Sequence, residues 1–174
     1  MAGQRGEIPF ARLAHRKSSV REAFKNLRKR PRRDPLHQVA ERRSVKVRQL
    51  IRLIPKDGGS RAALRKKRQL KCHRKCDGFK DVYGRMAWDR VSPTITGGCC
   101  NPSKGRFLHP IRHRAITPRE AALLQTFPPR YLFSLRRGKF AAAQMIGNAL
   151  PPEFIRRHAV SVLRFLERRS TNRS

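Results

Sequence analysis

The cysteines, with the histidine beside one of them, are the residues of this chain best suited to metal binding or nucleophilic chemistry. They are Cys72, His73, Cys76, Cys99 and Cys100. A zinc site usually has four ligands, with the members of a pair separated by two to four residues. Cys72 and Cys76, with three residues between them, give only a weak signal for such a pair, and adjacent cysteines such as Cys99 and Cys100 rarely bind one metal ion together. We therefore expect free thiols, not zinc ligands.

The other residue types do not indicate a complete catalytic site. The acidic residues are scattered, and several stand at predicted helix starts, so no carboxylate pair indicates general acid–base chemistry. The histidines form no cluster with the spacing of metal ligands. No glycine-rich loop of the usual phosphate-binding or dinucleotide-binding form is present. We expect neither a catalytic residue nor a metal ligand in this chain.

Positive charge dominates the composition. Lys and Arg number 43 against 11 Asp and Glu, which gives a formal net charge of +32. Such a charge is hard to hold in a compact fold without a polyanion, so nucleic acid is the expected partner. Composition alone fits a ribosomal-type or disordered basic protein equally well. No apolar run has the length of a signal-peptide core or a transmembrane helix, so we expect a cytoplasmic protein that does not enter a membrane.

Local patterns predict short helices in the first half of the chain. Ser19, with Glu22 three residues later, predicts a capping box at the start of a helix over 19–29. Apolar residues at helical spacing predict a second helix over 44–54. Residues 61–80 are strongly basic without periodicity, and we expect them to form a surface loop.

The second half has a different texture. Short β-prone runs bounded by glycine and proline predict strands or extended loops over 81–98. Residues 117–120 read Thr-Pro-Arg-Glu, a capping residue followed by proline and glutamate at the first and third helical positions. Two more helices are expected, over 139–146 and 151–168. The Gly-Asn pair that closes the first of them tolerates positive φ.

Three blocks of this half resemble, in order, conserved segments of DNA (cytosine-5) methyltransferases of the bacterial type. RAITPREAALLQTFPPRY (114–131) is similar to the ninth conserved motif of that family, and AAQMIGNALPPEF (142–154) is similar to the tenth. DVYGRMAWDRVSPTITGG with NPSKGRFLHP (81–110) resembles the segment between the target-recognition region and the ninth motif. The chain is thereby identified as the C-terminal portion of such an enzyme.

The resemblance implies a mixed α/β fold. A small target-recognition domain is expected, with C-terminal helices that return to a Rossmann-like S-adenosylmethionine-dependent methyltransferase domain, most of which is absent. The chain would then divide into an irregular segment (1–18), a basic target-recognition region (19–113) and the ninth- and tenth-motif helices (114–174). The expected location is the bacterial cytoplasm, with association to the nucleoid through DNA.

Double-stranded DNA is the substrate that the resemblance implies. An enzyme of this class must extrude the cytosine from the duplex, so it needs a second lobe clamped across the DNA. Thr94 and Thr96 are the expected hydroxyl donors to phosphate, with ordinary β-propensity as the alternative explanation of both. Arg114 and Arg119 either contact phosphate or pin the capped helix to its neighbours.

S-adenosyl-L-methionine is the implied cofactor, shared with the missing catalytic part. Asn148 and Ala149 of the tenth motif are expected at the edge of its pocket. Family chemistry also needs a Pro-Cys nucleophile and a Glu-Asn-Val motif, and this chain has neither. We therefore expect the chain alone to be inactive: a subunit that needs a catalytic partner, a truncated product, or a relic that only binds DNA. The rival interpretation is a non-enzymatic basic nucleic-acid-binding protein.

Overall fold

The computed structural model describes residues 10–11, 17–39, 42–74 and 81–171. Their contacts group them into two units. The first is Ser18–Ala149, and the second consists of the described residues of 1–17 and 150–174. The first unit runs without a break across the predicted division between residues 113 and 114. One reason is an ion pair that joins Arg119 to Asp34, far apart in the sequence.

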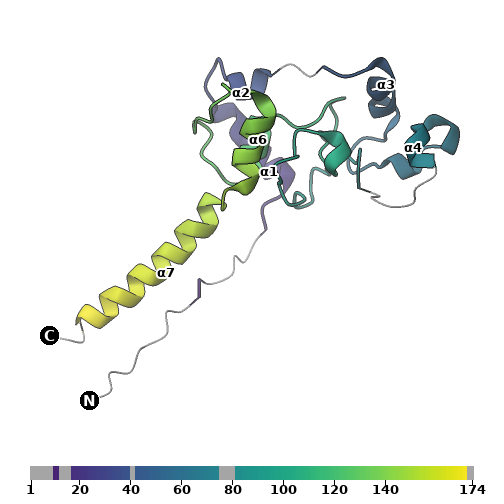
Figure 1. Cartoon of the computed structure of the whole chain (residues 1–174). Helices are drawn as coiled ribbons and strands as arrows, with labels where there is room; N and C mark the ends of the chain where they lie inside the picture. Colours follow the sequence, from purple (N-terminus) through teal and green to yellow (C-terminus); the bar gives the residue numbers. More distant parts are fainter. Residues whose placement is uncertain (1–9, 12–16, 40–41, 75–80, 172–174) are drawn as a thin grey trace. The chain divides into compact units, whose positions relative to one another are not determined.

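The helices of the first unit are short. They are α1 (Val20–Lys25), α2 (Pro35–Gln38), α3 (Val45–Leu53), α4 (Lys71–Arg74), α5 (Pro118–Leu124) and α6 (Gly138–Asn148), with 3-10 turns η1 (Asn26–Lys29), η2 (Arg61–Ala63), η3 (Lys66–Arg68) and η4 (Pro102–Lys104). Figure 1 shows α1, α2 and α6 gathered at one end of this unit and α3 and α4 at the other.

Two of the helices begin at the capping boxes that the sequence predicts. The Ser19 hydroxyl accepts from the Glu22 amide, and the Glu22 carboxylate accepts from the Ser19 amide, at 3.3 and 2.9 Å. Thr117 and Glu120 make the same reciprocal pair at the start of α5, at 3.2 and 2.8 Å. Each box satisfies amides that the first helical turn leaves without intrahelical partners. Both predicted helix starts are therefore confirmed.

The expected strands do not form within the described residues. Extended segments there meet only at isolated bridges, Arg85 with Leu108 and Leu108 with Ala115. The mixed α/β fold expected from the resemblance is thus not seen in the described part of the chain, which consists of helices and extended loops. A physical reason is that the backbone of this segment bonds to scattered partners and not along one neighbouring strand: the amides of Arg85 and Met86 donate to the carbonyls of Gly59 and Leu108.

Two hydrophobic clusters hold the first unit together. One packs α1, α5 and α6 around buried residues that include Met86, Ile95 and Phe107. The other packs the apolar face of α3 against Tyr83 and Leu108. Phe107 and Leu108 are neighbours in the chain but belong to different clusters, because successive side chains of an extended backbone point to opposite sides. The extended segments therefore connect the two ends of the unit.

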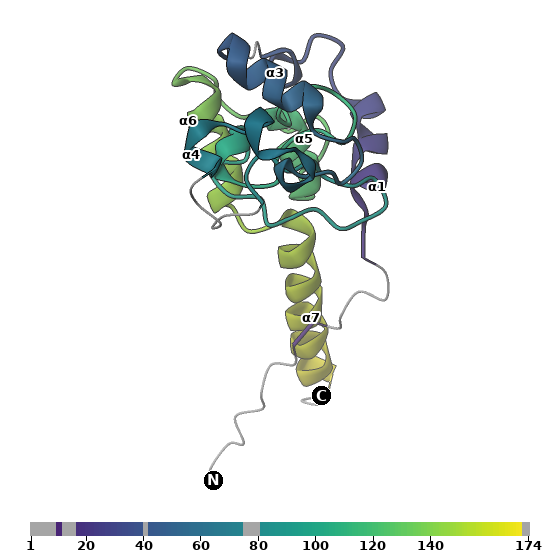
Figure 2. The same cartoon turned by 90° about the vertical axis from the view of Figure 1, so that its right-hand side faces the viewer.

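The second unit contains α7 (Pro152–Thr171), drawn as one continuous helix in Figure 2. It confirms the helix predicted over 151–168 and runs slightly further. Its apolar residues Phe154, Ile155, Leu163 and Leu166 are 44 to 55% exposed. None of the helices in the described ranges combines the length and the apolar character needed to cross a membrane.

Candidate functional site

Thr94 and Thr96 lie on an extended segment of the first unit. Both are exposed, whereas Ile95 between them is 4% exposed and belongs to the cluster around α1, α5 and α6. Side chains alternate between the two faces of an extended chain, so the buried Ile95 fixes both hydroxyls on the solvent side. Both threonines are accessible to a phosphate, and their contact with DNA stays a prediction.

The backbone after Thr96 lies directly against the last turns of α6. A Cβ added to Gly147 would overlap the Thr96 carbonyl carbon and the Gly97 nitrogen, and would stand 2.7 Å from the Thr96 oxygen. Only a glycine fits there. The prediction that this glycine adopts a positive φ to end the helix is wrong, because Gly147 lies inside α6 and has a negative φ. The structure thereby brings a predicted DNA contact, Thr96, next to the predicted cofactor residue Asn148.

Gln125 holds the turn that ends α6. Its side-chain amide donates to the carbonyl oxygens of Ile146 and Ala149, at 3.2 and 3.4 Å. The Ala149 amide also donates to the Ile146 oxygen, at 3.3 Å. Ala149 packs against the first hydrophobic cluster, while Asn148 is exposed. The backbone on both sides of Asn148 is thus fixed, and its side chain remains on the surface.

Arg119 is fully buried. Its guanidinium donates to both carboxylate oxygens of Asp34, at 2.6 and 3.2 Å, and to the Tyr131 carbonyl at 2.7 Å. Asp34 in turn caps α2 by accepting from the Leu36 amide at 3.1 Å. Of the two roles predicted for Arg119, this geometry favours the one that pins α5 to its neighbours, because a buried guanidinium is not open to a phosphate.

Arg114 binds Glu120 through two parallel hydrogen bonds of 2.7 Å. The Arg114 side chain is 23% exposed and that of Glu120 is 1% exposed. Burial opposes the charge on Glu120, but the hydrogen bonds and charge of Arg114 outweigh burial and hold the pKa of Glu120 below its usual value. Arg114 braces α5 and keeps one edge towards solvent, so a phosphate contact at this residue stays a prediction.

His109 lies beside the same carboxylate. Its Nε2 is 3.9 Å from Glu120, and its Nδ1 accepts from the amides of Ile111 and Arg112 at 3.2 and 3.1 Å. Burial lowers the pKa of His109 to about 4, against the attraction of Glu120 and with help from nearby arginines. The ring is therefore neutral near pH 7, which suits an Nδ1 that accepts two hydrogen bonds.

Sequence reasoning missed Arg85, which is also fully buried. It donates to four backbone carbonyls, two of them at the C-terminal end of α3, and lies 3.0 Å from Nδ1 of His113. The carbonyls at a helix C-terminus carry partial negative charge, which compensates part of the cost of burying the guanidinium. Burial still lowers the pKa of Arg85. Nothing in the local pattern around Arg85 marks it, because its partners are 24 to 34 residues away in the sequence.

Exposed basic side chains gather around α3 and η3. We call this set the basic surface: Lys46, Arg48, Arg52, Lys56, Arg65, Lys66, Lys67 and Arg68. Leu64 and Leu70 beside η3 pack on the same hydrophobic cluster as α3, so these elements occupy one end of the unit. A surface of this charge attracts phosphates through release of their counterions.

The cysteines divide by burial. Cys99 and Cys100 are 0 and 3% exposed, and a hydrogen bond between their thiols lowers the pKa of Cys99 and, together with burial, raises that of Cys100. Neither thiol is open to a nucleobase. Cys72 is exposed, and Cys76 lies outside the described residues. Among the residues that the structure describes, no three His, Cys, Asp or Glu side chains form a group able to hold a metal ion.

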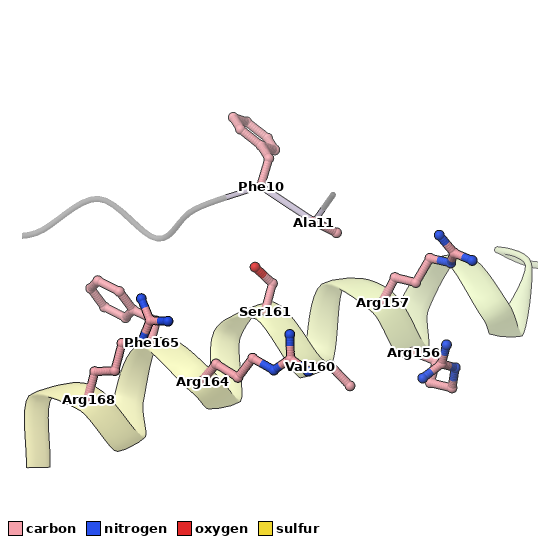
Figure 3. A pocket seen from close by; sticks show the side chains of 9 residues that line it. All are labelled: Phe10, Ala11, Arg156, Arg157, Val160, Ser161, Arg164, Phe165 and Arg168. Carbon is pink, nitrogen blue, oxygen red and sulfur yellow. The ribbon is translucent and has the colours of Figure 1, made fainter. Parts of the chain in front are cut away.

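An open cavity of about 510 Å³ runs along α7 in the second unit. Figure 3 shows Phe10 and Ala11 beside the helix, with Ser161 pointing towards their segment. The remaining lining residues are Arg156, Arg157, Val160, Arg164, Phe165 and Arg168. None of the predicted site residues lines this cavity, so it is a basic and partly apolar face of α7 and not part of the predicted site.

Comparison with known proteins decides the family. The model of the C-5 cytosine-specific DNA methylase family matches residues 8–164. The chain belongs to this family. The match includes both predicted motifs and the segment that carries Thr94 and Thr96. The family implies the S-adenosylmethionine-dependent methyltransferase fold, and the described residues of this chain are mainly helices and extended loops.

Its relatives are methylases of bacteria and animals. The chain is 42% identical over 138 residues to the type II methylase M.HgiDII of Herpetosiphon aurantiacus, covering 77% of this chain and 38% of the relative. It is 50% identical over 82 residues to the type II methyltransferase M1.BsuMI of Bacillus subtilis, covering 46% of this chain and 19% of the relative. It is 41% identical over 73 residues to DNA (cytosine-5)-methyltransferase 1 of Gallus gallus, covering 41% of this chain and 5% of the relative. The methylase chain therefore spans well under half of the length of these relatives.

Proposed function

We propose that this chain supplies DNA target recognition and the closing part of the cofactor domain in methyl transfer from S-adenosylmethionine to C5 of cytosine. The observation that carries the proposal is the direct contact between the Thr96 loop and the end of α6. That contact joins the segment predicted to face DNA to the turn predicted to face the cofactor. The family match over residues 8–164 supports both assignments.

The charge distribution supports DNA as the partner. The basic surface provides Lys and Arg side chains for phosphates, and the exposed hydroxyls of Thr94 and Thr96 are further donors. Arg114 retains a partly exposed edge. Arg119, whose guanidinium is used inside the unit, is proposed as a residue that positions α5 and not as a DNA contact.

The residues at the end of α6 fit a cofactor contact. Gln125 holds the carbonyls of Ile146 and Ala149, and the side-chain amide of Asn148 between them is exposed, where it can both donate and accept hydrogen bonds. S-adenosylmethionine would supply the electrophilic methyl group. This chain would hold one edge of the cofactor through Asn148 and Ala149, and would orient the duplex through the first unit.

We propose that the nucleophile comes from a catalytic part of the methylase that lies outside this sequence, on the same polypeptide or on another. None of the four cysteines follows a proline, and the two described cysteines of the first cluster, Cys99 and Cys100, are buried. The chain alone is therefore proposed to be inactive. The competing proposal is a non-enzymatic basic protein, which predicts binding to any polyanion without regard to its form.

Binding measurements separate the two proposals. We would titrate the chain with a double-stranded DNA oligonucleotide and with an RNA duplex of equal charge, at a fixed salt concentration. The methylase proposal predicts tighter binding to DNA, and weaker DNA binding for the double variant Thr94→Val and Thr96→Val. Thr171→Val, an exposed threonine of α7, is the matched control and should bind as the unchanged chain does. Equal affinity for DNA and RNA, unaffected by the double variant, would favour the non-enzymatic alternative.

A further inference from the structure

Three hydrogen bonds fix the turn after α6. The Gln125 side chain reaches from the C-terminal end of α5 to the carbonyls of Ile146 and Ala149, and the Ala149 amide closes back onto the Ile146 oxygen. The Ile146 side chain is fully buried, so the inner side of the turn cannot shift without disturbing the core. The conformation of the turn is thus set mainly from α5.

On its other side the end of α6 lies against the loop after Thr96. A Cβ on Gly97 would stand 3.2 Å from the Cα atom of Gln144, one helical turn before the overlap at Gly147. Two glycines on opposite sides therefore let the two backbones touch over a full turn of helix. Close-packed backbone has little free space to absorb a displacement, so movement of the loop must reach Gly147.

The two sets of contacts together form a mechanical connection. The loop carries the exposed Thr94 and Thr96 hydroxyls, and the far side of Gly147 continues into Asn148. The hydrogen bonds of Gln125 hold the turn together, so that a displacement of Gly147 moves the whole turn and is not absorbed by local motion. Without its two hydrogen bonds, two carbonyls of the turn would lose their side-chain donor.

We infer that Gln125 is a positioning residue that couples occupation of the Thr94–Thr96 loop by duplex DNA to the conformation of the Asn148–Ala149 turn. The inference rests on the proposed function, since it takes the loop as the DNA side and the turn as the cofactor side. Gln125 itself contacts neither ligand and acts through the backbone of Ile146 and Ala149. DNA binding would thereby order the cofactor edge before the methyl donor is used.

Hydrogen exchange on the 174-residue chain tests the coupling without any activity assay. The amide of Ala149 is followed with and without a short DNA duplex. In the unchanged chain, saturating duplex should slow this exchange by about fivefold or more, the lower end of usual coupling between two sites. In Gln125→Met, which keeps the length of the side chain but has no donor, the effect of DNA on Ala149 should disappear while duplex affinity stays within about twofold.

Gln69 offers a matched control. Its side-chain amide also donates to two backbone carbonyls, those of Leu64 and Arg61 at 2.8 and 3.3 Å. Gln69→Met removes equivalent hydrogen bonds elsewhere in the same unit and should leave the DNA effect on Ala149 intact. Gln125→Lys, which restores a donor of similar reach, should recover the effect, and this rescue is not expected of a residue that only fills space.

The outcomes separate this inference from the proposed function. Duplex binding without any change at Ala149 in the unchanged chain overturns the coupling and leaves the proposed function standing. A full DNA effect retained in Gln125→Met overturns the role of Gln125. Absence of duplex binding overturns the proposed function, and the coupling fails with it. The measurement on the unchanged chain decides the coupling even where Gln125→Met does not fold.

Discussion

Replacing Arg119 distinguishes its structural role from a role in DNA binding. Arg119 and Asp34 are 0 and 1% exposed, and removing one member of such a buried pair typically costs about 3–5 kcal/mol. Arg119→Met also removes the donor to the Tyr131 carbonyl, about 1 kcal/mol more. We expect a loss of about 4 kcal/mol or more in the free energy of unfolding. Stability is measured by urea denaturation followed by circular dichroism.

A second substitution tests the reason for that loss. Asp34→Asn removes the unpaired charge and keeps a side chain that can cap α2. The double variant Asp34→Asn with Arg119→Met should therefore be more stable than Arg119→Met alone, because no charge is left buried without a partner. The folded double variant should bind duplex DNA with the same salt dependence as the unchanged chain. A phosphate contact at Arg119 would instead reduce the slope of log affinity against log salt by about 0.9. A stable Arg119→Met with that reduced slope would refute the structural role.

Four further substitutions probe the unit that carries the site. Gly147→Ala should lower the free energy of unfolding by about 3 kcal/mol or more, because the new Cβ overlaps the backbone of the Thr96 loop. Gly138→Ala has open space around its Cβ but a positive φ, and should lower it by about 1 kcal/mol in the same denaturation assay. Equal losses for the two variants would contradict the close approach at Gly147. Arg85→Met should abolish the cooperative melt, because four carbonyls lose their donor at about 1–3 kcal/mol each; a melt unchanged within a few degrees would contradict this. The pKa of His109 is about 4 in the folded chain, against an ordinary value of 6.5. The neutral ring therefore contributes stability above pH 6.5, at most about 3 kcal/mol, and this contribution is lost as the pH falls towards 4. In His109→Gln, the free energy of unfolding should depend less on pH over that range. An unchanged dependence on pH would count against the neutral ring.

Local chemistry made part of this fold predictable. The capping boxes at Ser19 and Thr117 depend on residues three apart, so both helix starts can be found from the sequence. The amphipathic α7 follows from apolar spacing in the same way. The expected strands over 81–98 fail for a non-local reason, because a β-prone segment becomes a strand only when a neighbour supplies a ladder. In the described part of the chain, the amides of Arg85 and Met86 donate instead to two separate partners, the carbonyls of Gly59 and Leu108, and only isolated bridges form.

The candidate site was only partly predictable, and the contacts that position it are the ones that sequence reasoning missed. Thr96 and Asn148 were identified through the resemblance, but their proximity depends on Gly147 and Gly97 across 50 residues of chain. The pairing of Arg119 with Asp34 spans 85 residues. Gln125 lies in a motif that the sequence did identify, yet its two acceptors are 21 and 24 residues away. Such long-range partners leave no periodic or capping pattern in the sequence.

Reconstitution tests the central claim most directly. The chain would be co-expressed with a polypeptide that carries the Pro-Cys and Glu-Asn-Val motifs of the same methylase family, and methyl transfer from labelled S-adenosylmethionine to duplex DNA would be measured. Our account predicts no transfer by either polypeptide alone and sequence-dependent transfer to cytosine by the two together. Transfer by this chain alone would contradict it, as would the absence of transfer from a pair that forms a stable complex on DNA.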